Sequence, residues 1–423
     1  MKVLKKLTAF ILAGSCIVNS GCSNKATITP KEQQTVITLS WWGNDARNDY
    51  TIQAMELFQE QNPDIKVKCS YSEWSGYEAR NRVRMISETE EDVMQINAAW
   101  IPQYSPKGNG YYNLDELDDI IDLSTFPGEY LKFGRVRDKL NGIPIAMNAE
   151  TVYINKTIYD KYGLDIPKTW DDFFTAAKAM REDRIYPLSV NSKSLWLLAI
   201  SYAEQQSGKT FLNEDGSFGF TDSELKTMID LYCRLVDEKV IPQVEYYEKL
   251  NIVNGTYAGT VAWISDAANY CGKAIDNGYE IIPADYPTNG KVQSGEGWYA
   301  KPASFYAISK NTEHPEEAAK LMNFMLNSKE MALLQGVEKG IPISIAARNY
   351  LDEAGMLTGL QYDASLVMEN NQNLKHMDPF MENSTLIDKF IQQSNLVIYE
   401  KSTSDDAAQV LLHAITKALA PSE

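Results

Sequence analysis

The chain has 423 residues, of which 44% are hydrophobic and 11% aromatic, which excludes a disordered or collagen-like protein. Domains usually span about 100 to 200 residues, so this length predicts two domains or one unit with a cleft between its halves. Forty basic and 57 acidic residues give a net charge of −17, which repels phosphate backbones, so we expect no nucleic-acid partner.

Histidine and cysteine are too sparse for most metal sites and histidine-centred hydrolases. The three histidines (His314, His376 and His413) have no HxxxH spacing, and the five cysteines form no CxxC pair. We therefore expect no metal and no cofactor. Cys69, Cys233 and Cys271 are odd in number, which favours buried thiols over a disulfide framework.

Residues 1–21 have the organisation of a signal peptide. Lysines precede the apolar stretch 7–18, which is too short for a permanent membrane helix but suits a signal-peptide core. Small residues then precede Cys22, and the polar stretch 22–34 after it predicts a flexible linker. The arrangement resembles a bacterial lipobox, which implies that diacylglycerol on Cys22 anchors the exported protein to the outer face of the cytoplasmic membrane.

Two alternatives to this anchor stay open. Cys16 also follows small residues and is a competing attachment site. The other alternative is an ordinary secretory signal that is cleaved without any lipid being attached.

Alternating strand and helix patterns follow the linker. A β-prone run stops at Gly43, and later segments alternate or repeat at helical spacing. The order predicts βαβ units and a parallel sheet. The expected strands are 36–42, 65–71 and 92–97, and the expected helices are 51–61, 77–86, 170–181, 224–238, 315–326 and 407–418.

Polar residues and a tryptophan follow two of the expected strands. In open α/β sheets, ligands bind beyond the carboxyl ends of the strands. This rule makes Asn44, Asp45, Arg47, Asn97 and Trp100 candidate ligand-binding residues.

The segment SWWGNDARNDYTIQAMELFQEQNPDIKV, followed by the acidic and apolar run 92–97, resembles the extracellular solute-binding proteins of sugar ABC importers. The NGIP motif at 141–144 and PKTW at 167–170 are similar to the region where such proteins first cross between lobes. Residues 305–309 and GIP at 340–342 are similar to the return crossings.

The resemblance implies an α/β fold of two periplasmic-binding-protein-like lobes, joined by a hinge of several strands, with the ligand cleft between them. The implied N-terminal lobe comprises 35–148 and 302–342, and the C-terminal lobe 149–301 and 343–423. The implied function is to bind an oligosaccharide outside the cell as a monomer and deliver it to the permease subunits of an ABC transporter, without enzymatic activity.

Among these importers, the chain resembles binding proteins for pectic and other plant-derived oligosaccharides, whose opening pattern is WWGGxxRH. Asn44 and Asn48 replace the second Gly and the His of that pattern. The sugar itself stays open. An acidic sugar would need cations in the cleft, for which Arg47 is placed by the motif and Lys301 is a weaker candidate.

Sugar rings stack on aromatic side chains, and their hydroxyls pair with amides, carboxylates and guanidinium groups. Trp298 lies beside two glycines just before a crossing and is the best stacking candidate, whereas Trp41 and Trp170 are assigned to the core. The remaining cleft residues implied by the resemblance are Trp74, Asn148, Trp196, Trp263 and Asp266.

Two other functions remain possible from the sequence. An exported polysaccharide-degrading enzyme would share an aromatic cleft, but it needs two carboxylates roughly 5 to 9.5 Å apart, and no such pair is recognisable. A receptor domain that senses sugar without import would have the same lobes.

Overall fold

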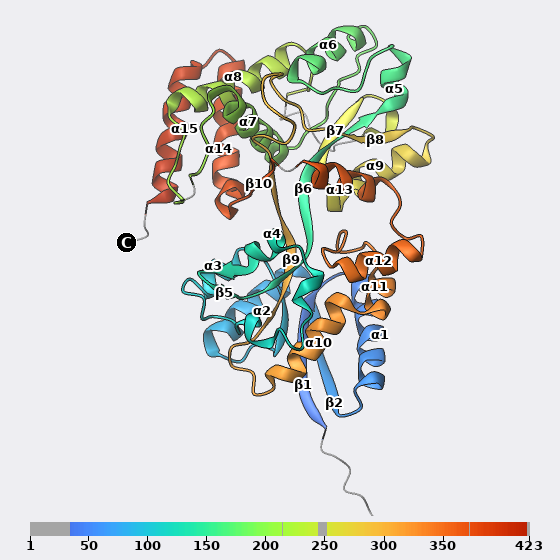
Figure 1. Ribbon diagram of the computed structural model, residues 1–423. Coiled ribbons are helices and arrows are strands. Elements are labelled where there is room, and N and C mark those ends of the chain that lie inside the picture. Colours follow the sequence, from blue (N-terminus) through green and yellow to red (C-terminus); the bar gives the residue numbers. More distant parts are fainter. Residues whose placement is uncertain (1–33, 214, 244–251, 372, 421–423) are drawn as a thin grey trace, which may run out of the picture.

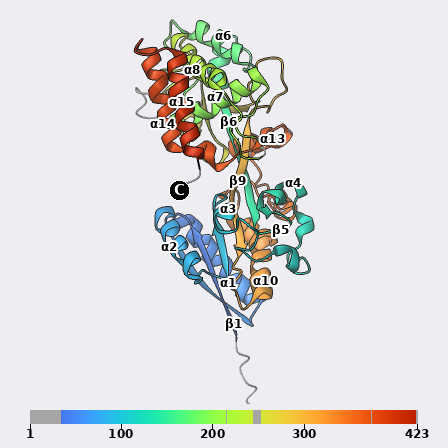
Figure 2. The same cartoon turned by 90° about the vertical axis from the view of Figure 1, so that its left-hand side faces the viewer.

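A computed structural model describes the chain in four stretches, residues 34–213, 215–243, 252–371 and 373–420. Two lobes lie one above the other, and the long strands β6 (Ile143–Asn155) and β9 (Tyr299–Ile308) run from one into the other (Figure 1). The view turned by 90° shows the same two strands between the lobes (Figure 2). The expected two-lobed α/β architecture is confirmed.

The N-terminal lobe is built on parallel βαβ units. β1 (Thr35–Trp42) pairs in parallel with β2 (Ile65–Ser72) and β3 (Val93–Ile96), as the sequence predicts. The connecting helices are α1 (Asp45–Gln61), which ends at its expected residue, and α2 (Trp74–Ser87), which is close to its expected position. The other helices are α3 (Trp100–Tyr104), α4 (Gly128–Leu131), α10 (Pro315–Asn327), α11 (Lys329–Gln335) and α12 (Ile345–Glu353).

The helix α1 begins earlier than its apolar spacing predicts. Asn44 is its N-cap, and the Asn44 side chain accepts a hydrogen bond of 2.9 Å from the backbone N–H of Arg47. Such a cap satisfies a backbone donor that the helix leaves free, so a polar first turn can precede the buried face. This cap fixes the position of Arg47 next to the end of β1.

The C-terminal lobe adds antiparallel strands and most of the helices. β7 (Gly259–Trp263) and β8 (Ile281–Ala284) both pair with the second half of β6. The helices are α5 (Lys156–Lys161), α6 (Trp170–Met180), α7 (Ser192–Ser207), α8 (Asp222–Asp237), α9 (Ala267–Asp276), α13 (Leu360–Asn370), α14 (Ser384–Ile398) and α15 (Ser404–Leu419).

One sheet passes through both lobes. Its strand order is β2-β1-β3-β9-β6-β7, with β8 also on β6 and β10 (Lys375–His376) on β9. β9 is antiparallel to both β3 and β6, so it ties the parallel strands of one lobe to the antiparallel strands of the other. A separate hairpin joins β4 (Arg135–Val136) and β5 (Lys139–Leu140).

The third crossing between lobes lies later than the expected boundary at 342. The helix α12 packs on α11 and α10 of the N-terminal lobe, and its Leu351 is fully buried. The helix α13 packs instead on β8 and α9 of the C-terminal lobe. The chain therefore crosses between α12 and α13, because the apolar face of α12 (Ala347 and Leu351) packs on Ala332 of α11.

The three described cysteines are free thiols. Cys271 is buried, but Cys69 is exposed although it shares a face of β2 with the buried Ile65 and Val67, so the expectation of buried thiols is wrong for Cys69. Within the described stretches, no helix has both the length and the apolar character needed to span a membrane.

Candidate functional site

A cleft of about 290 Å³ lies between the lobes, beside β6 and β9 and beyond the ends of β1 and β3. Both lobes supply its walls. Its lining residues are Trp42, Arg47, Gln95, Asn148, Lys193, Trp263, Ser265, Asp266, Lys301, Ala303, Ser304, Glu338 and Lys339.

The N-terminal wall carries Arg47 and Lys339. Arg47 Nε donates to Glu338 Oε2 at 2.6 Å, and its Nη2 donates to the Glu338 carbonyl oxygen at 3.2 Å. Lys339 Nζ donates to Gln95 Oε1 at 3.2 Å and to the Tyr306 hydroxyl at 2.9 Å. This wall therefore has two cations and the one carboxylate of Glu338.

The Lys339 ammonium is held in the sheet rather than in solvent. Burial, together with the nearby charge of Arg47, lowers the pKa of Lys339 to about 7. Gly340, at φ 102°, follows it in a turn so tight that a Cβ there would come within 2.8 Å of the Ala146 Cβ. This close approach to the hinge strand keeps Glu338 and Lys339 on the cleft wall.

The C-terminal wall carries a second pair of cations around one carboxylate. Glu382, at the end of the short helix η7 (Pro379–Glu382), forms ion pairs with Lys193 through Oε1 and with Lys301 through Oε2. Both ammonium groups also lie over the Trp263 ring, at 5.2 Å for Lys193 and 4.5 Å for Lys301 from the ring centroid. Such contacts attract a cation to the ring face.

Burial shifts the pKa values of the charged groups on this wall. Burial lowers the pKa of Lys301. Burial works against ionisation of Glu382 too, but the two lysines hold its pKa below the usual value. Behind them lies Glu150 of β6, whose pKa burial raises to about 7 although Ser194 Oγ donates a 2.7 Å hydrogen bond to it.

The floor of the cleft is polar. Asn148 Nδ2 donates to Ser265 Oγ at 2.9 Å, and the Ser265 N–H donates back to Asn148 Oδ1 at 3.2 Å. Asp266 is half-buried beside them and accepts from Asn269 at 3.4 Å. The structure therefore brings four of the predicted site residues, Arg47, Asn148, Trp263 and Asp266, to one cleft.

A cluster of three tryptophan side chains extends from the cleft along the N-terminal lobe. Trp42 lines the cleft, and the Trp74 ring meets it edge-on at 5.0 Å. Trp74 is 38% exposed and stacks on Trp100 at 5.8 Å, whereas Trp100 is buried. Trp74 can therefore contact a bound molecule that projects from the cleft, while Trp100 supports the ring behind it.

Two predicted stacking residues are in the core instead. Trp196 is fully buried and donates from its indole nitrogen to the Met381 carbonyl oxygen at 2.9 Å. Trp298 is 3% exposed and stacks on Trp170 at 6.3 Å. Neither ring can stack on a ligand here, because each is enclosed by the apolar side chains of the C-terminal lobe. The assignments of Trp41 and Trp170 to the core are confirmed.

Three predicted polar residues do not line the cleft. Asn44 caps α1, and Asp45 is exposed in the first turn of that helix. Asn97 Oδ1 accepts from the Ala99 N–H at 2.9 Å, which stabilises a turn. Asn48, which replaces the His of the pectic pattern, accepts from the Trp41 indole nitrogen at 3.0 Å. The predicted attachment site Cys22 lies outside the described residues.

Four charged residues at the cleft were missed in the sequence: Lys193, Glu338 and Lys339 line it, and Glu382 pairs with Lys193 without being part of the lining. Lys193 is in the first turn of α7, and Glu382 follows α13, far along the sequence. Nothing local marks either one. Glu338 and Lys339 immediately precede the GIP motif of a crossing, and this proximity could have indicated them.

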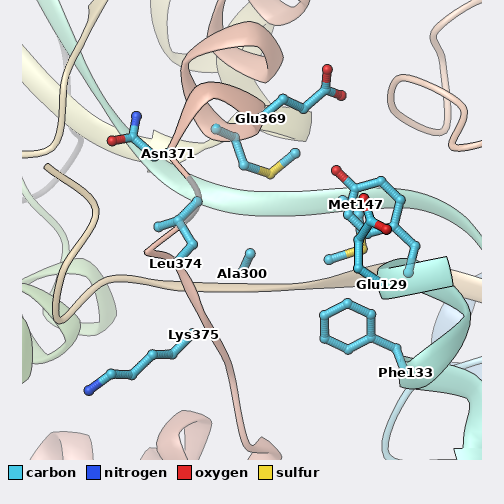
Figure 3. Close-up of a pocket in the computed structure, with 10 residues that line it drawn as sticks. Glu129, Phe133, Met147, Ala300, Glu369, Asn371, Leu374 and Lys375 are labelled. Carbon is cyan, nitrogen blue, oxygen red and sulfur yellow. The ribbon is translucent and has the colours of Figure 1, made fainter. Parts of the chain in front are cut away.

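A second cavity, of about 420 Å³, lies on the other face of the hinge strands. Met147 and Ala300 line it, whereas their neighbours Asn148 and Lys301 line the cleft, as expected when successive strand side chains point to opposite faces. Figure 3 shows these two residues with Phe133 of the N-terminal lobe and Glu369 of α13. Arg348 of α12 forms an ion pair with Glu369 and so links the lobes behind the hinge.

Within the described part of the chain, no three acidic, histidine or cysteine side chains are grouped so as to hold a metal ion. The cleft therefore offers charged groups, amides and aromatic rings as its means of binding. These groups suit recognition of a polar ligand that also has apolar faces.

Comparison with known proteins gives consistent results. The multiple sugar-binding protein of Streptococcus mutans is 22% identical over 82% of this chain and 84% of its own length. A solute-binding protein from Pectobacterium atrosepticum superposes with a TM-score of 0.81 at 31% identity, over 91% of this chain and 99% of that chain. An oligogalacturonide-binding protein from Yersinia enterocolitica, in complex with digalacturonic acid, superposes with a TM-score of 0.75 at 30% identity, over 92% of this chain and all of that chain.

The model of the family described as bacterial extracellular solute-binding protein matches residues 44–332. This match covers more than half of the chain and includes both hinge strands, the N-terminal wall up to α11, and Trp263. The chain is thus the solute-binding component of an ABC transporter and not an enzyme, and it belongs to the family of bacterial extracellular solute-binding proteins.

Proposed function

We propose that this protein captures an acidic oligosaccharide in the cleft and presents it to the permease subunits of an ABC importer. The observation that carries the proposal is the charge of the two walls. Arg47 and Lys339 lie on one wall, and Lys193 and Lys301 lie on the other. Glu338 and Glu382 each lie beside one pair, and Asp266 is a third carboxylate at the cleft, so with Lys339 protonated the four cations exceed the three carboxylates by one charge, which a sugar carboxylate can neutralise.

The aromatic groups support a sugar rather than another anion. Trp42 and Trp263 line the cleft on opposite lobes, and each ring is partly exposed. Sugar rings bury their CH-rich faces on such side chains while their hydroxyls meet the amide of Asn148 and the carboxylate of Asp266. A small inorganic anion would use the lysines but leave both rings unused.

Solved relatives favour the same ligand class. The Yersinia enterocolitica protein is an oligogalacturonide-binding protein, and digalacturonic acid carries a carboxylate on each sugar. A ligand with two carboxylates can pair one of them with the cations of each lobe. Contact with both lobes would favour closure of the cleft around the ligand, a state that a permease can distinguish from the open one.

Calorimetric titration tests this proposal. Digalacturonate and trigalacturonate should bind tightly, while neutral disaccharides of the same size should bind far more weakly. A preference for neutral sugars would contradict the proposed ligand class. The same samples should release no reducing ends, since a binding protein returns its ligand unchanged.

We also propose that the protein is held at the membrane by lipid on Cys22. The apolar stretch 7–18 and the small residues before Cys22 support this attachment. Cys22→Ser should release the protein to the medium or leave an unprocessed precursor. Unchanged labelling of that variant by a fatty-acid probe would show that Cys22 is not the attachment site. Cys16→Ser is the matched control, and its labelling and membrane attachment should be unchanged.

A further inference from the structure

Glu382 is bound on both sides by cations that line the cleft. Its two carboxylate oxygens contact different lysines, Oε1 with Lys193 and Oε2 with Lys301. These three side chains come from η7, α7 and β9, which are distant in sequence. The carboxylate therefore lies in a receptor formed by two ammonium groups above the Trp263 ring.

The receptor is partly open to solvent. The side chain of Glu382 is 23% exposed, that of Lys301 23% and that of Lys193 37%. Glu382 is also the last residue of a four-residue helical turn, rather than a residue inside a long element. Rotation of its side chain can move the carboxylate toward solvent without unfolding any helix or strand.

Glu150, the other carboxylate near these lysines, does not compete for the same position. It is buried on β6, where it accepts a hydrogen bond from Ser194, and no ion pair joins it to either lysine among the described contacts. Glu382 is thus the carboxylate that neutralises the exposed side of this cation pair.

We propose that Glu382 is an internal stand-in for the ligand's carboxylate: it occupies the anion position of the C-terminal wall in the empty cleft, and an acidic ligand displaces it. This inference rests on the proposed function and adds a specificity-determining residue to it. The need to displace Glu382 lowers the affinity for every anionic ligand, because the ligand must break the two ion pairs of Glu382 before it forms its own. Weakly interacting anions are therefore excluded from the cleft.

A neutral sugar gains nothing from displacing Glu382. Such a ligand binds beside the intact ion pairs and uses the rings and amides of the cleft. The effect of removing the Glu382 charge should therefore depend on the charge of the ligand, which separates this role from a general structural one.

Glu382→Gln is the informative variant, since glutamine keeps the size and one acceptor but removes the charge. Its affinity for digalacturonate should increase about tenfold, which corresponds to about 1.4 kcal/mol. Its affinity for a neutral disaccharide should not change. The matched control is Glu280→Gln, which removes the same charge from an exposed pair with Lys156 at 3.7 Å, and it should leave both affinities unchanged.

A second probe is independent of sugar binding. Malonate is a small dicarboxylate, and millimolar malonate should raise the melting temperature of Glu382→Gln by more than that of the wild type. If the wild type binds no oligosaccharide but this malonate effect appears, the proposed function fails while the role of Glu382 stands.

The opposite results would overturn the inference. Weaker binding of digalacturonate by Glu382→Gln would show that Glu382 organises the two lysines for the ligand rather than competing with it. Unchanged binding would show that the ligand does not use this position. If Glu382→Gln folds poorly, Glu382→Asp replaces it: the shorter side chain cannot bridge both lysines, so the affinity for digalacturonate should again rise.

Discussion

The two walls of the cleft hold similar charges in different ways. On the N-terminal wall, Lys339 is buried and its ammonium is fixed by hydrogen bonds to Gln95 and Tyr306 of the sheet. On the C-terminal wall, Lys193 and Lys301 are partly exposed and are held by the carboxylate of Glu382. The ammonium of Lys339 is therefore fixed by the sheet, whereas the two lysines of the C-terminal wall are held by a partly exposed carboxylate.

This difference predicts different sensitivities. A buried ammonium is destabilised by loss of water, so the charge of the N-terminal wall depends on pH. The lysines of the C-terminal wall are partly exposed and are held by ion pairs with Glu382, so this wall depends on salt and on competing carboxylates. The predictions below test this contrast, starting with the largest expected effect.

The first prediction concerns Trp263, whose ring lies under the two lysines of the C-terminal wall. Trp263→Ala loses both its stacking face and its contacts with Lys193 and Lys301. Loss of one stacking ring costs about 1 to 3 kcal/mol in comparable systems, so affinity should fall about 5 to 150-fold. Calorimetry of the folded variant measures this effect.

Trp298→Ala is the control, because Trp298 lies in the core. Truncation of such a residue costs about 3 to 5 kcal/mol of stability, and thermal melting should detect the loss. The affinity of the folded fraction should be unchanged. The assignment of the two tryptophans would be reversed if Trp263→Ala lost stability and Trp298→Ala lost affinity.

The second prediction concerns Lys339 on the N-terminal wall. Its pKa is about 7 when folded, below the roughly 10.4 of an unfolded lysine. Between pH values of about 7 and 10, Lys339 is mostly deprotonated in the folded protein but protonated in the unfolded chain. The free energy of unfolding therefore increases as pH rises through this range. Lys339→Met should remove this slope and be more stable than the wild type at pH 6, as measured by chemical denaturation.

Binding has the opposite dependence on pH. An anionic ligand favours the charged form of Lys339, so affinity should fall as pH increases through about 7, with proton uptake on binding just above that pH. Calorimetry in two buffers with different ionisation heats measures this uptake. Lys339→Met should bind acidic sugar roughly tenfold more weakly at pH 6, the magnitude expected for one charge-assisted hydrogen bond.

The third prediction applies to Glu150 behind the C-terminal wall. Burial raises its pKa to about 7, so Glu150 becomes negative above neutral pH and weakens the attraction of the nearby lysines for an anion. Glu150→Gln should increase affinity a few-fold at pH 8 and leave it unchanged at pH 6. An equal effect at both pH values would contradict titration of Glu150 in this range.

The fourth and smallest effect is expected behind the hinge. Arg348 and Glu369 link the lobes on the face opposite the cleft, and closure of the cleft should pull them apart. Ion pairs of this exposure contribute at most about 1 kcal/mol, so Glu369→Gln should raise affinity by no more than about fivefold. Weaker binding by this variant would show that the pair is needed in the closed state.

Much of the fold could be predicted from the sequence because it depends on local patterns. The alternation in β2 and the helical spacing in α10 are such patterns, whereas the crossing at NGIP was implied by the resemblance to a known family. The chain's crossing after α12 could not be predicted, because the helical pattern of α12 does not reveal which lobe will cover its apolar face.

The binding site was less predictable for the same reason. Trp263 and Asn148 were implied by the resemblance to the family, whereas Trp298 lies beside two glycines just before a crossing but turns its ring into the core. Lys193 and Glu382 meet only after α7 and η7 have docked. A charge pair assembled from distant segments leaves no periodicity or spacing in the sequence.

The most direct test of the central claim compares digalacturonate with its dimethyl ester by calorimetry. The ester keeps both sugar rings and their linkage but has no charge, so only the carboxylates are tested. Two charge-assisted contacts at about 1.5 kcal/mol each predict binding of the ester at least about 100-fold weaker than that of the acid. Equal affinities for the two ligands would contradict recognition of the carboxylates by the two walls.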